Sequence, residues 1–232
     1  MGKPAANGHL IEPRYGFSEV SRILRTPRPT LRTWCLGWKE ARGRKAQPAV
    51  VVPDGDLTEP ACLSFFNLVE ARFLAAYRGV GVPMQRVRPA LEFVKERMGV
   101  PRPLLTQRFE TDGRNLFIQW ISERHEAKGL LDVSAGGQYA WPEVVASHFR
   151  EIEFRGERPV RLWLNPAHTI AVDPTIGFGL PTIATKGVRT EILFERFETG
   201  ETVDQIVEDF GLERADVEEA IRWEASPIRI AA

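Results

Sequence analysis

The chain has 232 residues, of which 43% are hydrophobic and 27% charged, and its 31 basic residues balance 31 acidic ones. This composition is that of an ordinary globular protein, long enough for one substantial core or for two or three small modules. The two cysteines, Cys35 and Cys62, exclude a disulfide scaffold and a cysteine-rich zinc site. No apolar run reaches the roughly 20 residues of a membrane helix. The first residues lack the apolar stretch of a signal peptide, so we expect a cytoplasmic protein without a membrane partner.

The balanced net charge conceals a strong segregation along the chain. Residues 14–48 carry nine basic and two acidic side chains, a net charge of +7, and residues 72–108 carry eight and two, a net charge of +6. Residues 188–224 instead carry four basic and twelve acidic side chains, a net charge of −8. A basic segment attracts phosphate and an acidic one repels it. The charge pattern therefore favours DNA contact near the N-terminus and protein contact near the C-terminus.

The N-terminal part has the pattern of a helix-turn-helix. Apolar residues at spacings of three and four predict a helix over 17–24. The pair Thr26-Pro27 is a helix-start signal, a hydroxyl cap followed by proline at the first helical position. It predicts a second helix that runs to about Trp38 and buries Leu31 and Trp34.

The middle of the chain is predicted to be mixed. In chain order we expect a strand over 48–53, helices over 65–77 and within 84–98, a β-hairpin over 108–118 turning at Asp112-Gly113, a helix over 142–149, and strands over 151–154 and 160–164 joined at Gly156. Pro89 lies inside the second helical pattern, so that helix either is kinked or begins there. Helix, turn, helix and hairpin follow one another as in a winged helix.

A bridge rich in proline and glycine, residues 173–181, leads to a final helical module. Three helices are predicted there, over 190–198, 202–210 and about 214–223, and Thr202 and Gln205 have the spacing of a capping box. The residues expected in its core are Phe194, Phe197, Val203, Ile206, Val207, Phe210, Leu212, Val217 and Ile221. The chain as a whole is predicted to be α+β, mostly α. Its expected domains are a helix-turn-helix region over 1–55, a winged-helix-like region over 56–165 and a three-helix, helix-turn-helix-like domain over 173–232.

The second helix of the N-terminal motif is the candidate recognition helix for the major groove of DNA. The residues expected to contact bases or phosphates are Arg25, Arg28, Thr30, Arg32, Thr33, Lys39, Arg42 and Arg44. The alternative is a solvated basic helix pair of a protein-binding module. The basic segment 72–108 has two interpretations as well, a second DNA-contacting winged helix or a structural platform with exposed arginines.

Catalytic motifs are missing from the sequence. It contains no phosphate-binding loop, no Gly-x-Ser-x-Gly elbow and no zinc-ligand spacing, and its four histidines are scattered. We therefore expect no enzyme activity, no cofactor and no metal.

The last sixty residues resemble a small domain of prokaryotic proteins that is known as a domain of unknown function. The matching segments are Asp173-Pro174-Thr175-Ile176, Phe178–Ile183, Ile192–Gly200, Val203–Leu212 and Val217–Ile221. With an N-terminal helix-turn-helix and the mixed middle region, the full arrangement resembles the VapB-type antitoxins of type II toxin–antitoxin systems. The resemblance implies a PIN-domain ribonuclease toxin as partner, operator DNA as a second partner with autorepression of the operon, and a homodimer.

Two arginines are candidates for contact with such a toxin. PIN-type nucleases hold metal with clustered carboxylates, and Arg222 or Arg229 could place a cation there. For Arg229 the alternative is a frayed terminus. Two other functions stay open from the sequence alone, a stand-alone helix-turn-helix transcriptional regulator and a scaffold without a DNA role.

Overall fold

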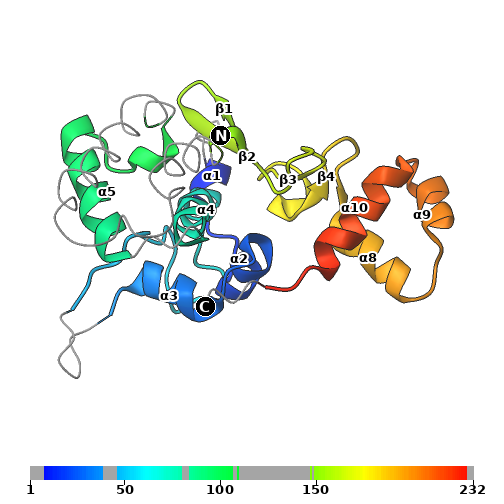
Figure 1. Ribbon diagram of the computed structural model, residues 1–232, viewed down its shortest axis with the longest axis horizontal. Helices are drawn as coiled ribbons and strands as arrows, with labels where there is room; N and C mark the ends of the chain where they lie inside the picture. The colour runs from blue at the N-terminus through cyan, green and yellow to red at the C-terminus, as the bar shows by residue number, and fades with distance from the viewer. Residues whose placement is uncertain are drawn as a thin grey trace, which may run out of the picture.

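The computed structural model describes residues 8–38, 46–79, 84–106, 109, 147 and 149–228. Its elements, in chain order, are α1 (Gly8–Ile11), α2 (Phe17–Leu24), α3 (Arg28–Leu36), α4 (Phe65–Gly79), α5 (Met84–Met98), η1 (Pro103–Leu105), β1 (Ile152–Arg155), β2 (Arg158–Trp163), β3 (Ile170–Val172), η3 (Gly177–Gly179), β4 (Thr182–Ile183), β5 (Val188–Arg189), α8 (Thr190–Glu198), α9 (Val203–Phe210) and α10 (Arg214–Ala225). The α+β class with a helix-turn-helix near the N-terminus is confirmed. The molecule is elongated, with α1–α5 at one end, the sheet between, and α8–α10 at the other end (Figure 1).

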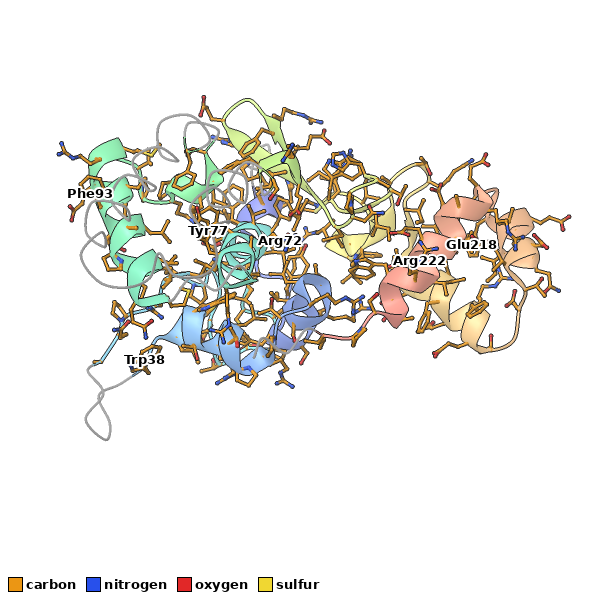
Figure 2. All side chains as sticks on the ribbon, in the orientation of Figure 1. Trp38, Arg72, Tyr77, Phe93, Glu218 and Arg222 are labelled. Carbon is orange, nitrogen blue, oxygen red and sulfur yellow. The ribbon has the colours of Figure 1, made fainter. Side chains whose placement is uncertain are left out.

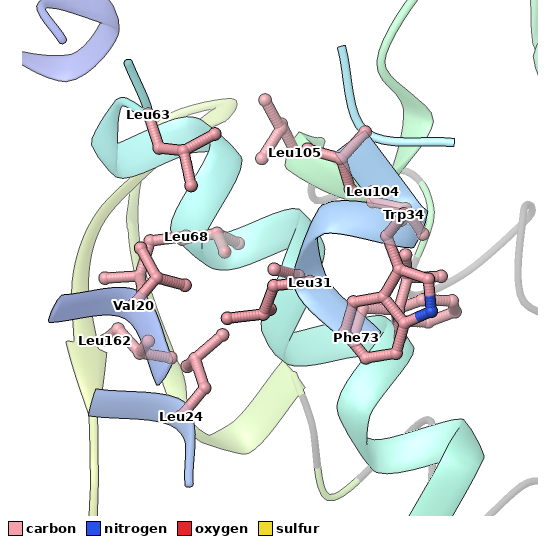
Figure 3. Packing of buried hydrophobic residues seen from close by; sticks show 14 of the residues in the cluster. Val20, Leu24, Leu31, Trp34, Leu63, Leu68, Phe73, Leu104, Leu105 and Leu162 are labelled. Atoms are coloured by element: carbon pink, nitrogen blue, oxygen red, sulfur yellow. The ribbon is translucent and has the colours of Figure 1, made fainter. Parts of the chain in front are cut away.

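The helix-turn-helix consists of α2 and α3, and both pack on α4. Val20, Leu24 and Leu31 lie in one core with Leu68 and Phe73 of α4 (Figure 3). Leu31, Leu68 and Phe73 are fully buried. Burial of a large apolar side chain stabilises the fold by about 1.5–3 kcal/mol relative to exposure, so these contacts determine the position of α3 on α4.

The start of α3 differs by one residue from the prediction. Pro27, not Thr26, is the N-cap residue, and Arg28 is the first helical residue. The Thr26 hydroxyl instead donates a hydrogen bond to the carbonyl oxygen of Leu24 at 3.1 Å. The helix ends at Leu36, two residues before the predicted end, because the chain then turns and Trp38 pairs with Gln47.

The predicted strand over 48–53 is wrong. The amides of Val50 and Val51 donate to the carbonyl oxygen of Trp34, at 2.8 and 3.2 Å, and not to a neighbouring strand. The carbonyl oxygen of Val52 accepts from the Asn67 side chain at 2.8 Å. Prolines at both ends of this apolar run lack the N–H groups that a strand ladder needs.

The helices α2, α4, α5, α8, α9 and α10 and the strands β1 and β2 lie close to their predicted positions, whereas α1, β3, β4 and β5 were not predicted. The helix α5 runs through Pro89, as the kinked alternative requires, and does not begin there. Thr202 and Gln205 form the predicted capping box at the start of α9. The predicted hairpin over 108–118 and most of the predicted helix over 142–149 lie outside the described residues.

The strands β1 to β5 form one antiparallel sheet in sequential order. This sheet takes part in two apolar clusters of the described residues. Leu162 and Val172 belong to the core around α4, whereas Ile170 and Ile183 belong to the core of α8, α9 and α10. The proline- and glycine-rich bridge, residues 173–181, contains turns and η3 and lies between β3 and β4 of the sheet that joins the two cores. The predicted domain boundaries stay a prediction.

The core of the C-terminal helices differs from the prediction mainly on α8. Leu193 is fully buried in it, whereas Phe197 is 42% exposed and Phe194 is only half-buried. Ala220 of α10 is also buried there and was not predicted. Because α8 has apolar side chains on more than one face, periodicity alone did not identify the buried one.

An ion-pair network joins the loop around Asp54, which precedes α4, to Glu70 on α4 and to Arg102. The Arg102 guanidinium donates to Glu70 at 2.6 Å and to Asp54 at 2.9 Å, and Asn67 bonds to the same loop. Burial raises the pKa of Glu70, and the hydrogen bonds from Arg102 oppose that shift. A buried carboxylate without a partner cation destabilises the fold, so the pairing with Arg102 offsets the cost of burying Glu70.

Gly179 on η3 is in direct contact with Tyr15, which precedes α2. Its carbonyl oxygen accepts a hydrogen bond from the Tyr15 hydroxyl at 2.8 Å, and its φ of +76° lies in the left-handed region. A Cβ atom at this position would stand 2.6 Å from the Tyr15 hydroxyl. Only glycine satisfies both constraints without strain.

We expect Gly179→Ala to lower the free energy of unfolding by about 2–4 kcal/mol, through left-handed strain and a clash with Tyr15. Gly99→Ala is the matched control, since Gly99 has a φ of +65° and open space around its missing Cβ atom. The control should cost about 1 kcal/mol. Urea unfolding of both variants tests this, and equal losses would mean that the contact with Tyr15 is unimportant.

Candidate nucleic-acid interface

The outward face of α3 has the composition of a DNA-contacting surface. Arg28 and Arg32 are exposed and lie one helical turn apart, while Leu31 and Trp34 on the inner face are buried. This separation follows the 3.6-residue period of the helix. Two guanidinium groups on a helix anchored from behind can reach base edges or phosphates in a major groove.

The two threonines of α3 lie at the side of this face. Thr30 and Thr33 are half-buried, and the Thr33 hydroxyl donates to the carbonyl oxygen of Pro29 at 2.9 Å. The Arg32 guanidinium lies 5.2 Å from the centroid of the Phe17 ring, which links it to α2. Both threonines stay candidates for phosphate contact. Lys39, Arg42 and Arg44 lie outside the described residues.

Arg25 occupies a different environment from the other candidates. It is the C-cap residue of α2, with a φ of 51°, and its side chain turns toward the C-terminal helices. Its guanidinium lies 4.3 Å from the centroid of the Trp223 ring and donates to the Trp223 carbonyl oxygen. Burial lowers the pKa of Arg25. Since its charge is engaged with α10, we leave Arg25 out of the DNA surface proposed below.

Arg22 makes a second contact of the same kind. Its Nη1 atom lies 3.2 Å from Oε2 of Glu224 and 3.5 Å from Oε1 of Glu191. The Glu224 carboxylate is nearly buried and also accepts from the Thr190 hydroxyl at 2.7 Å. The turn of the helix-turn-helix is therefore docked on the junction of α8 and α10.

A third contact lies at the start of the helix-turn-helix. Besides the hydrogen bond from Tyr15 to Gly179, Nη1 of Arg14 donates to the carbonyl oxygen of Pro174 at 2.7 Å. Burial raises the pKa of the Tyr15 phenol above its ordinary range, so the hydroxyl stays a proton donor at neutral pH. The charge pattern of the sequence pointed to two separate ends, but the structure brings basic and acidic segments together.

Two arginines were predicted to contact a toxin. Arg222 is 69% exposed and pairs with Glu219 on α10, and Figure 2 shows it between the sheet and Glu218. Arg229 lies outside the described residues.

Among the described residues, the most exposed large apolar side chain is Phe178, which is 84% exposed and has a φ of 60° on η3. An exposed aromatic ring on a left-handed backbone is a candidate for contact with a partner, and sequence periodicity did not identify it.

The described residues contain no group of three or more His, Cys, Asp or Glu side chains placed to hold a metal ion. None of the helices in this part of the chain is long and apolar enough to cross a membrane.

Two sequence families match the chain, one for each of the regions in contact. Residues 13–91 match the family described as "Putative DNA-binding HTH domain", which includes α2, α3 and α4. Residues 170–223 match the family described as "Protein of unknown function (DUF433)", which includes the strands from β3 onward and the C-terminal helices. The two matches fall on the helix-turn-helix and on residues 170–223, which are called the DUF433 region below.

Two similar proteins span nearly the whole chain. The "Putative antitoxin VapB45" of Mycobacterium tuberculosis (strain ATCC 25618 / H37Rv) is 29% identical over 223 residues, covering 90% of this chain and 92% of the relative. The X-ray crystal structure of Rv2018 from Mycobacterium tuberculosis is 26% identical, with a TM-score of 0.71 over 90% of this chain and 97% of that one. Together these similarities support a VapB-type antitoxin with an N-terminal helix-turn-helix, as the sequence resemblance implied.

The contact between the two regions can be measured by a double-mutant cycle. We expect Arg22→Ala, Glu224→Ala and the double variant to give a coupling energy of about 1 kcal/mol, because the pair is only partly exposed. In 1 M NaCl the coupling should fall by at least half through screening. Urea unfolding at both salt concentrations provides the measurement, and a coupling of zero at low salt would show that the docking does not depend on this pair.

Proposed function

We propose that the protein is a non-catalytic, cytoplasmic antitoxin that binds its own operator DNA and a PIN-type ribonuclease toxin. The observation that supports it most is the 29% identity to an antitoxin-named relative along nearly the whole length of both chains. In this proposal α3 enters the major groove, and the DUF433 region binds the toxin. Occlusion of the nuclease site, or a cation placed among its carboxylates, would silence the toxin.

The DNA side of the proposal rests on the exposed guanidinium groups of α3. Arg28 and Arg32 are the described cations that α3 presents to solvent. Thr30 and Thr33 flank them, and Lys39, Arg42 and Arg44 would extend the basic surface past the helix. A homodimer would place two such helices about one DNA turn apart, roughly 34 Å, on a palindromic operator. Repression of the operon would follow from occupancy of that site.

The toxin side of the proposal rests on exposed groups of the DUF433 region. Phe178 would fill an apolar pocket on the toxin, since buried aromatic side chains dominate the energetics of interfaces. Arg222, with its exposed guanidinium, is the described candidate for the carboxylates of the nuclease, and Arg229 is the other. The acidic character of this region favours a protein over DNA as its partner, because phosphates would be repelled.

Arg28→Ala and Arg32→Ala should each weaken binding to DNA from upstream of the gene by about 3–10-fold. Loss of a phosphate contact lowers the dependence of log K on log salt by about 1, whereas loss of a base contact reduces the preference for upstream over scrambled DNA. Fluorescence anisotropy over a NaCl series measures both. Arg155→Ala, in the β1–β2 hairpin away from α3, is the control with the same change of charge. A wild type that does not prefer upstream DNA would contradict the operator role.

Co-expression with the adjacent reading frame tests the toxin partner. We expect the two proteins to co-purify, the partner alone to degrade RNA and arrest growth, and Phe178→Ser to weaken the complex at least tenfold. Arg222→Ala and Arg229→Ala distinguish the two candidate cations by loss of inhibition. Leu57→Ser, at an exposed apolar residue before α4, is the matched control. If no neighbouring product binds while upstream DNA is still bound, the protein is a stand-alone regulator.

A further inference from the structure

A cleft of about 460 Å³ runs along one side of α3. Thr30 and Thr33 of α3 line one wall together with Trp38, which follows the helix. Arg78, in the last turn of α4, and Gln85, in the first turn of α5, belong to the same cleft. Three segments that are distant in sequence therefore meet beside the candidate recognition helix. Figure 2 shows Trp38 at the margin of the molecule, next to this end of α3.

The described helices around the cleft are basic on this side. No acidic residue occurs in α3, in α4 after Glu70 or in α5 before Glu92. Arg78 is exposed, as are Arg28 and Arg32 on the adjoining face of α3. The cleft therefore complements an anion.

A buried cation adds to this potential. The Arg88 guanidinium lies 5.3 Å from the centroid of the Trp38 ring, which lines the cleft, and donates to the Pro48 carbonyl oxygen. Arg88 is 8% exposed, and its Nε and Nη2 atoms have no hydrogen-bond partner in the described part of the chain. Burial lowers the pKa of Arg88. A guanidinium still carries its charge at neutral pH, so the wall of the cleft faces a positive charge that pairs with no carboxylate of the described residues.

The dimensions of DNA suggest the occupant. An α-helix with its side chains is about 10–12 Å wide and fills a major groove of about 12 Å, so the sugar–phosphate strands run along its two sides. Hydroxyl, amide and guanidinium groups beside a recognition helix are therefore placed for phosphate oxygens and not for base edges.

We propose that the cleft between α3, the last turn of α4 and the first turn of α5 binds one sugar–phosphate strand of duplex DNA, with Arg78 and Gln85 as its phosphate contacts. This inference rests on the proposed DNA binding by α3. It assigns a role to the basic segment 72–108, which the sequence alone left open between DNA contact and structural platform. Part of that segment is structural, since Arg72 pairs with Glu151 and Arg102 with Glu70.

The test is fluorescence anisotropy of the full chain over a NaCl series, with a duplex of about 30 base pairs that has either the upstream or a scrambled sequence. Arg78→Ala should weaken binding to both duplexes by the same factor, about 3–10-fold near 0.1 M salt, and lower the salt slope by about 1. Gln85→Ala should weaken binding by about 2–3-fold without a change in slope, since it removes a neutral donor. Arg78→Lys should restore the wild-type slope, because a phosphate contact requires only a cation.

Arg97→Ala is the matched control, because Arg97 is exposed in the last turn of α5, about 20 Å along the helix from Gln85. Thermal unfolding of each variant confirms that the fold is intact. If Arg78→Ala binds like Arg97→Ala while Arg28→Ala binds weakly, the cleft does not contact DNA and the proposed function stands. If the wild type binds no duplex at any salt concentration, the proposed DNA binding fails, and the assignment of the cleft fails with it.

Discussion

Burial of α4 is the interaction on which the rest of the structure depends. Leu68, Val69, Phe73 and Leu74 are all fully buried, so this helix has apolar side chains on more sides than one neighbour can cover. It is surrounded by α1, α2, η1 and β2. A helix that is apolar on all sides is unstable at a surface and must be covered by other elements. The helix-turn-helix, the loop after it and the sheet therefore pack around α4 in one core.

The position of the candidate DNA face follows from that burial. Leu31 and Trp34 hold the inner side of α3 in the core, so Arg28 and Arg32 face outward without any other support. The packing that stabilises the fold is therefore also the packing that would keep a recognition helix rigid against DNA. The exposed arginines contribute little to stability themselves, which leaves them available for binding.

The docking of α2 on α10 couples the two regions of the protein. Arg22 pairs with the Glu224 carboxylate of α10, and Arg25 stacks on the Trp223 ring of the same helix. A partner that binds α10 therefore acts on a surface that touches the turn of the helix-turn-helix. The shared sheet strengthens this link, because Val172 lies in one core and Ile170 in the other. Under the proposed function, these contacts would link toxin binding on α10 to DNA binding by α3.

Local patterns in the sequence determined α2, α5, the three C-terminal helices and the capping box of α9, because period and capping depend on neighbours within one or two turns. The outward position of Arg28 and Arg32 followed from the same period. The segment 48–53 was predicted wrongly, since its hydrogen-bond partners, Trp34 and Asn67, are distant in sequence. Likewise, only the tertiary structure decided that Arg25 stacks on Trp223, and that Arg78 stands beside α3. Such contacts depend on the packing of separate elements. The periodicity of the sequence therefore cannot show that Arg25 contacts an acidic helix while Arg78 stays exposed.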